Sequence, residues 1–185
     1  IIDPDVAVIT SIDLDHMDFL GPDRESIGFE KAGIYRRGRP AVCADADPPQ
    51  SLMEHAKAIG ADLLLNDRDF GVVAEPRQWR YWGPHSKRNG LPWPALRGSC
   101  QLVNAAACIT ALDALRERGC RLAVVTNKEG HYTEIVLRAH GLLPMFDRVI
   151  SGDSVPTKKP DPAGVLQCLQ HFGVPREQAL FVGDS

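Results

Sequence analysis

Leu122-Ala-Val-Val-Thr-Asn-Lys128 is the stretch of sequence that decides the fold, because an apolar run ends there abruptly in polar residues. The run 121–126 has the length and composition of a buried strand. It is followed by an alternation of helical patterns at 132–139 and 162–172 with strand patterns at 146–150 and 180–182. Strands that alternate with helices indicate a parallel sheet with crossover helices, and therefore an α/β fold.

The earlier part of the chain shows the same alternation. Apolar runs predict strands at 6–10, 40–44 and 61–65, and helical patterns are present at 23–32, 48–60 and 100–118. Gly33 is a plausible C-cap of the first of these helices. Residues 66–97 differ in composition from the rest of the chain, since their aromatic, Pro and Gly residues favour short β-ribbons and turns. The polar stretch 11–18 is expected to be a loop.

Composition excludes several classes of protein. The 185 residues are 44% hydrophobic and 24% charged, which suits one medium or two small globular domains. The net charge of −3 lacks the basic footprint of a nucleic-acid binder. No apolar run approaches the roughly 20 residues that cross a bilayer. Five cysteines without C-x-x-C spacing indicate reduced thiols, so a cytoplasmic protein with no nucleic-acid or membrane partner is expected.

Both ends of the chain interrupt predicted strands. The first residue is Ile1 rather than Met, and a strand pattern begins at Val6. The pattern at 180–182 runs directly into the polar residues 183–185, where the sequence ends. Because a domain rarely starts or stops inside its core sheet, the chain is expected to be a fragment at both ends.

A cluster of acidic residues and one imidazole follows the first strand. Asp13, Asp15, His16 and Asp18 lie where open α/β sheets place ligands, and Glu30-Lys31 follows on the next helix. Hard oxygen ligands favour Mg²⁺. A solvated acidic turn with a capping Asp explains the same residues, so composition alone leaves both interpretations open.

Two motifs of this region carry a resemblance. Thr10-Ser-Ile-Asp-Leu-Asp-His-Met-Asp-Phe-Leu-Gly21 and Ile27-Gly-Phe-Glu-Lys-Ala-Gly-Ile34 resemble the central ATPase domain of folylpolyglutamate synthase/dihydrofolate synthase, a Mur-ligase-like ATP-dependent amide ligase. The likeness runs from about Asp5 to Leu115. It implies ATP and Mg²⁺ as cofactors, folate and glutamate as substrates, His16 as a magnesium ligand and Lys31 as a carbamylated lysine. The segment 96–105 is similar to the one near the adenine, which makes Asn104 the base-contacting residue.

The ligase resemblance is incomplete. Cys100 stands where the family often has a histidine. The family's phosphate-binding loop G-x-x-x-x-G-K-[ST] is missing from the sequence and is expected upstream of Ile1. The family's metal-binding glutamate and its glutamate-binding domain are missing as well. Gly28 to Gly33 has the glycine spacing, but Ile34-Tyr35 follows in place of Lys and Ser/Thr.

Three motifs of the last part carry a second resemblance. Leu122–Lys128, Gly152-Asp-Ser-Val-Pro-Thr-Lys-Lys-Pro-Asp-Pro162 and Leu180-Phe-Val-Gly-Asp-Ser185 are similar, in order, to motifs of haloacid-dehalogenase-type phosphatases, with phosphoglycolate phosphatase nearest. The resemblance implies a Rossmann-like core and an aspartyl-phosphate mechanism on Mg²⁺. Thr126 and Asn127 would hydrogen-bond the phosphoryl oxygens of a phosphate monoester, Lys159 would neutralise charge, and Asp184 would ligate the metal.

Three interpretations of the whole chain remain open. The first is a fused fragment, with a partial ligase-like domain at 1–115 joined near 114–119 to a partial phosphatase core at 116–185, both incomplete and inactive alone. The second is a working phosphatase that uses Asp13 or Asp15 as nucleophile, since the usual Asp-x-Asp segment is lacking. The third is a non-catalytic binding remnant that pairs with an intact partner. The sequence indicates no oligomeric state.

Overall fold

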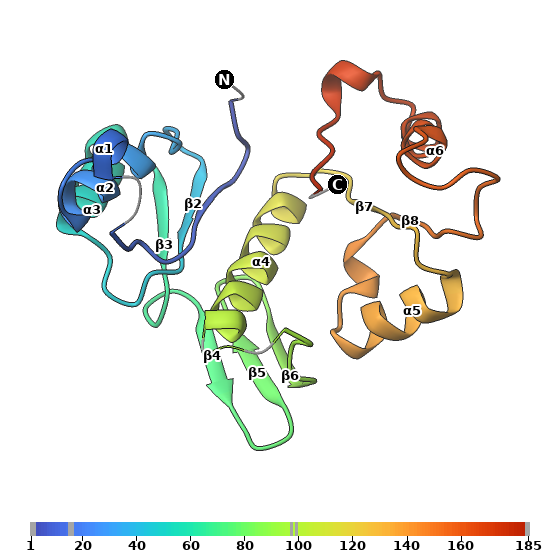
Figure 1. Ribbon diagram of the computed structural model, residues 1–185, viewed down its shortest axis with the longest axis horizontal. Helices are drawn as coiled ribbons and strands as arrows, with labels where there is room; N and C mark the ends of the chain where they lie inside the picture. The colour runs from blue at the N-terminus through green and yellow to red at the C-terminus, as the bar shows by residue number, and fades with distance from the viewer. Residues whose placement is uncertain (1–2, 15–16, 97, 99, 184–185) are drawn as a thin grey trace. The chain divides into compact units, whose positions relative to one another are not determined.

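A computed structural model of the protein describes residues 3–14, 17–96, 98 and 100–183. The chain divides into two compact units, Ile1–Arg118 and Gly119–Ser185, and each is described by itself (Figure 1). Among the described helices, none has both the length and the apolar character that crossing a bilayer requires.

The first unit is built on a three-stranded parallel sheet. Its strands are β1 (Ala7–Ile9), β2 (Pro40–Cys43) and β3 (Asp62–Leu65), in the order β1-β2-β3. The connections carry helices α1 (Met17–Leu20), α2 (Arg24–Ala32) and α3 (Gln50–Ile59). Figure 1 shows these helices on one side of the sheet, and α4 (Cys100–Glu117) on the other side, in contact with β1 and β2.

Local sequence explains where α2 and α3 begin and end. Asp23 is the N-cap of α2, because its carboxylate accepts a hydrogen bond from the Ser26 backbone N–H at 2.8 Å. Gly33 ends α2 and Gly60, in the left-handed conformation at φ 71°, ends α3. The apolar faces of both helices and the strands form one core, which includes Ile27, Leu52 and Ala56.

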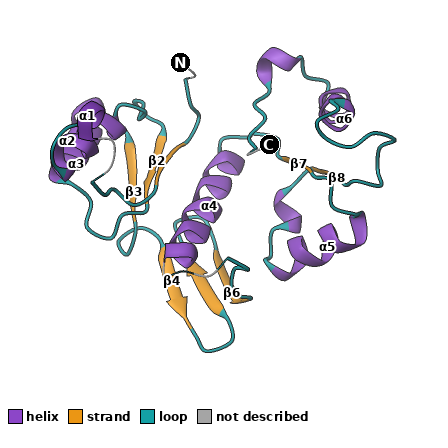
Figure 2. Ribbon diagram, in the orientation of Figure 1, coloured by secondary structure: helices purple, strands orange, loops and turns teal. Residues whose placement is uncertain are grey.

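An antiparallel ribbon completes the first unit. Its strands are β4 (Gly71–Ala74), β5 (Trp79–Trp82) and β6 (Lys87–Leu91), drawn as neighbouring arrows below α4 in Figure 2. Tyr81 is buried, and a 3.0 Å hydrogen bond joins its hydroxyl to that of Thr110 on α4. Arg88 of β6 pairs with the buried Asp113 at 3.0 Å. These polar contacts fix the register of the ribbon on α4.

The second unit is a parallel βαβ arrangement. It contains β7 (Ala123–Val125), α5 (Gly130–Ala139), β8 (Arg148–Ile150) and α6 (Ala163–Phe172), with short 3₁₀ turns at Leu143–Met145 and Arg176–Gln178. Strands β7 and β8 pair in parallel, with Val124 beside Val149. Helix α6 packs so closely on them that a Cβ on Gly164 would lie 2.8 Å from a methyl group of Val125.

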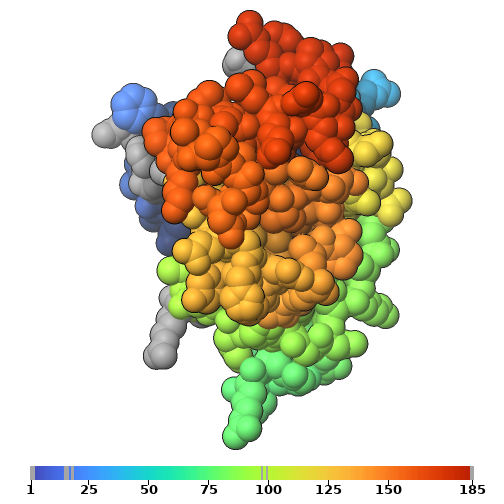
Figure 3. All heavy atoms as spheres, turned by 90° about the vertical axis from the view of Figure 1, so that its right-hand side faces the viewer, coloured from blue at the N-terminus to red at the C-terminus, as the bar shows by residue number. Residues whose placement is uncertain are grey.

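The structure confirms the α/β class, the parallel strands with crossover helices, and the ribbon within 66–97. One predicted strand is wrong. Residues 180–182 form no strand, because in the described part of the second unit they pair with neither β7 nor β8. Their side chains are exposed in the terminal segment drawn red in Figure 3. The short helix α1 overlaps the end of the predicted loop 11–18 and was not expected from the sequence.

Candidate functional site

The first candidate site lies at the carboxyl end of β1. A cavity of about 230 Å³ there is lined by Val8, Ile9, Thr10, Ser11, Lys31 and Ile34. The half-buried Lys31 comes from the last turn of α2, and the two hydroxyl residues follow β1 directly. The strand and helix therefore bring one predicted site residue, Lys31, to the strand end where the sequence placed the site.

An ion pair with one buried partner, Asp45, fixes the loop that leaves β1. Asp45, at the end of β2 and only 5% exposed, accepts hydrogen bonds from the Ile12 backbone N–H at 2.5 Å and from the Arg24 guanidinium at 3.0 Å. The Arg24 Nε donates to the Ile12 carbonyl oxygen at 3.0 Å. Both the N–H and the carbonyl oxygen of Ile12 are therefore hydrogen-bonded, which holds the loop at this residue. Sequence reasoning missed Arg24 and Asp45, although a lone Asp directly after a predicted strand was a usable signal.

The other predicted residues of this site are placed differently. Asp15 and His16 lie outside the described residues. Asp13 is exposed, and its carboxylate accepts from the neighbouring Leu14 backbone N–H. Asn104 is half-buried on α4 and does not line the cavity around Lys31. Within the described ranges, no three His, Cys, Asp or Glu side chains gather as a metal would require.

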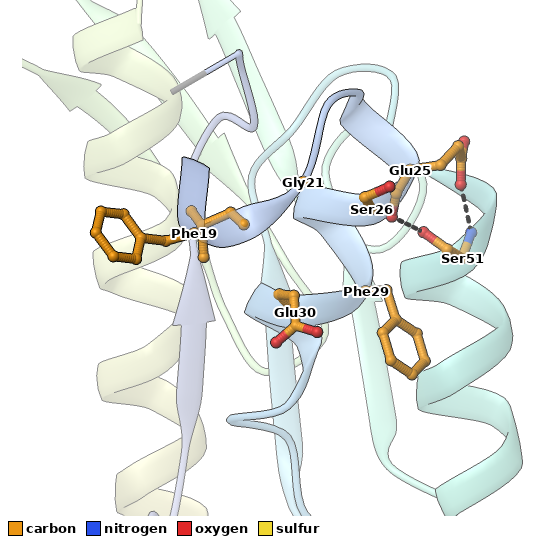
Figure 4. Close-up of a pocket in the computed structure, with 8 residues that line it drawn as sticks. Phe19, Gly21, Glu25, Ser26, Phe29, Glu30 and Ser51 are labelled. Atoms are coloured by element: carbon orange, nitrogen blue, oxygen red, sulfur yellow. Dashed lines mark hydrogen bonds between the residues drawn. The ribbon is translucent and has the colours of Figure 1, made fainter. Parts of the chain in front are cut away.

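A second, larger cavity of about 520 Å³ lies among α1, α2 and α3. In Figure 4 its apolar side chains, Phe19 and Phe29, project from α1 and α2, with Glu30 between them. Glu25 at its edge accepts from the Ser51 backbone N–H at 2.8 Å, and this bond holds the pKa of Glu25 below its usual value. The carboxylate of Glu25 therefore caps the start of α3.

The second candidate site lies on the loops after β7 and β8. Thr126 follows β7, and its hydroxyl accepts from the Lys128 backbone N–H at 3.2 Å. The Asn127 side chain bonds both backbone groups of Lys159: Nδ2 donates to the carbonyl oxygen at 3.0 Å, and Oδ1 accepts from N–H at 2.7 Å. The ammonium group of Lys159 lies 5.8 Å from the ring centre of Phe181.

Hydrogen bonds therefore join the loop of Thr126 and Asn127 to Lys159, which lies 32 residues after Asn127 in the sequence. The predicted metal ligand Asp184 lies outside the described residues. Asp153, which was not singled out, accepts from the Gly130 backbone N–H at 2.9 Å and from the Ser151 hydroxyl at 2.6 Å. The Ser151 bond, followed by the Gly130 bond, lowers the pKa of Asp153.

Comparison with known proteins finds similarity to two different kinds of enzyme. The dihydrofolate synthase/folylpolyglutamate synthase of Escherichia coli (strain K12) is 36% identical over 150 residues, which are 81% of this chain and 34% of that protein. The structure titled E. coli FolC in complex with DHPP and ADP is 40% identical over 61% of this chain and 26% of its own, with a TM-score of 0.57.

Residues 101–185 match the family described as haloacid dehalogenase-like hydrolase. The phosphoglycolate phosphatase of Nitrosospira multiformis is 51% identical over 74 residues, which are 40% of this chain and 33% of that protein. The chain is similar to two different enzymes. Both resemblances drawn from the sequence motifs are thus confirmed, and the chain spans about a third or less of these curated relatives.

The two similarities overlap, because an alignment of 150 residues and a match over 101–185 do not fit side by side in 185 residues. The hydrolase match begins within α4. The division into compact units falls nearby, between Arg118 and Gly119. The assignment of 1–115 to one family and 116–185 to the other stays a prediction.

Proposed function

We propose that the first unit is the part of a folylpolyglutamate synthase-type amide ligase that binds Mg²⁺ and ATP. The observation that carries the proposal is the cavity at the end of β1, where Lys31 lies with the hydroxyl residues Thr10 and Ser11. The similarity to the E. coli synthase supports it. Folate and glutamate are the substrates that follow from this relationship.

The donors at this cavity fit a hard cation. Thr10 and Ser11 carry hydroxyl oxygens, and reaction of the neutral Lys31 amine with CO₂ would give a carbamate with loss of a proton. That reaction replaces a cation with an anionic oxygen ligand, which is the type Mg²⁺ prefers. His16 would complete the ligands and Asn104 would contact the base. Bound Mg²⁺ would supply charge neutralisation for phosphoryl transfer to the carboxylate that becomes an amide.

The contribution of the chain's own residues is to hold the loop in place. The Arg24–Asp45 pair holds both backbone groups of Ile12, so the loop is fixed at this residue before any ligand binds. A loop that is already ordered loses less conformational entropy when a ligand binds, so the entropic cost of binding is lower. The 185 residues contain no G-x-x-x-x-G-K-[ST] segment. We therefore expect the chain alone to bind nucleotide without forming an amide.

Calorimetric titration of the 185-residue chain with Mg-ADP tests this function. We expect a dissociation constant on the order of 1 mM, weakened about tenfold in Lys31→Ala. Lys57→Ala, an exposed lysine on α3, is the matched control and leaves the affinity unchanged. Binding that is absent, or equal in Lys31→Ala and wild type, contradicts the proposal. Amide product from folate, glutamate and Mg-ATP contradicts the expected lack of turnover.

A second candidate function belongs to the second unit: binding of a phosphate monoester. The observation that favours it is the pair of hydrogen bonds through which Asn127 joins the Thr126 loop to Lys159. Thr126 and Lys159 would hold the phosphoryl oxygens, and Asp184 would hold Mg²⁺. Release of phosphate from phosphoglycolate that is lost in Asp13→Asn or Asp15→Asn would establish a working phosphatase. We expect binding of phosphate without its release, as in a non-catalytic remnant.

A further inference from the structure

The two loops that follow β7 and β8 are held together at several points. The Gly152 backbone N–H donates to the Lys128 carbonyl oxygen at 2.8 Å. Asp153 bonds the Gly130 backbone N–H at the start of α5. On the other side of Asn127, the Thr126 backbone N–H donates to the Ile150 carbonyl oxygen at 2.9 Å. Because Thr126 and Lys128 flank Asn127, these contacts fix the backbone of Asn127 relative to β8 and the loop after it.

This arrangement of the two loops requires a glycine at position 152. A Cβ at Gly152 would overlap the Asn127 carbonyl oxygen and lie 2.8 Å from its carbon. The second loop therefore approaches the Asn127 backbone more closely than any other residue type allows. From this position the Asn127 side chain reaches the segment between β8 and α6.

That segment, residues 151–162, is irregular and contains bends and turns in place of helix or strand. The Asn127 amide meets it at Lys159 alone, and bonds the N–H and the carbonyl oxygen of that one residue. Such a two-bond contact fixes both the position and the rotation of the Lys159 backbone. The direction in which the Lys159 side chain leaves the backbone is then set by Asn127.

We propose that Asn127 is a positioning residue that acts on phosphate through Lys159. The inference rests on the proposed phosphate site, and it differs from the role expected from the sequence, in which Asn127 bonds the phosphoryl oxygens itself. One N–H and the oxygen of the Asn127 amide already bond Lys159. The affinity of the second unit for phosphate therefore depends on Asn127 only as long as position 159 carries a lysine.

A double-mutant cycle tests this dependence. Inorganic phosphate is titrated by calorimetry into the wild-type chain, Asn127→Ala, Lys159→Ala and the double variant. We expect each single variant to bind about tenfold more weakly, and the double variant to bind no more weakly than Lys159→Ala. Lys158→Ala, the exposed neighbouring lysine, controls for loss of charge alone and changes the affinity less than about twofold. Additive losses in the double variant overturn the proposal.

Amide hydrogen exchange measured by NMR tests the contact without phosphate. In wild type the Lys159 amide is protected, and Asn127→Ala removes at least about tenfold of that protection. The Gly152 amide, which donates to Lys128, stays protected and shows that the loops remain folded. Unchanged exchange at Lys159 overturns the positioning role. If the wild-type chain binds no phosphate, the phosphate site is overturned, and with it any role of Asn127 toward phosphate. The expected exchange in the same chain would still support the contact between Asn127 and Lys159.

Discussion

Gly152 shows how one missing side chain determines a local arrangement. Since a Cβ would meet the Asn127 backbone, which has no freedom to rotate away, Gly152→Ala must push the two loops apart. We expect a loss of about 3 kcal/mol in the free energy of unfolding of the second unit, measured by urea denaturation. Gly173→Ala is the control, because it has open space and costs only about 1 kcal/mol for its positive φ. Equal losses would show that the close approach is unimportant.

Asp153 makes the same loops sensitive to pH. Its pKa is lowered by the hydrogen bonds from Ser151 and Gly130, so the ionised form is favoured in the folded state. A carboxyl group with a lowered folded pKa contributes stability that is fully present above its usual value of 3.8 and is lost as the pH falls through the folded pKa. We therefore expect the protection factor of the Gly130 amide, the intrinsic exchange rate divided by the observed rate at the same pH, to decrease as the pH falls below about 4. Asp153→Asn abolishes this pH dependence if the carboxylate is its source.

At the scale of elements, α2 carries a capping residue at its start and the proposed site residue Lys31 near its end. Its N-cap, Asp23, accepts from the backbone N–H and the hydroxyl of Ser26, and its last turn contains Lys31. We expect Asp23→Ala to lower the free energy of unfolding of the first unit by about 1 kcal/mol, measured by thermal denaturation. Asp23→Asn retains an acceptor and loses only a few tenths. A loss as large in Asn as in Ala would locate the effect outside the cap.

The elements also show what the sequence does and does not predict. Helices α2 and α3 follow from their apolar spacing and from Gly33 and Gly60, which are local signals. The strand predicted at 180–182 fails, because an apolar run becomes a strand only with a partner to pair with. The position of Lys31 near the end of β1 could be predicted, because its motif lies on a helix that follows this strand. The Arg24–Asp45 pair and the Asn127–Lys159 contact join residues 21 and 32 positions apart, and no local pattern encodes them.

At the scale of the whole molecule, two compact units meet at Arg118 and Gly119. Each has its own sheet, so each is expected to unfold as its own cooperative unit. Differential scanning calorimetry should resolve two transitions, one lowered by Asp23→Ala and the other by Gly152→Ala. A single transition that moves by the same amount in both variants would show that the units depend on one another for stability.

The aromatic ribbon has a practical consequence. The sequence contains 3 tryptophans, which lie at Trp79, Trp82 and Trp93, all within the first unit. Indole emission is therefore an optical signal of the first unit alone, from rings that include the buried Trp79 and the exposed Trp93. A sample whose second unit has denatured would still fluoresce like native protein, and a reporter indole introduced on α6 would make unfolding of that unit visible.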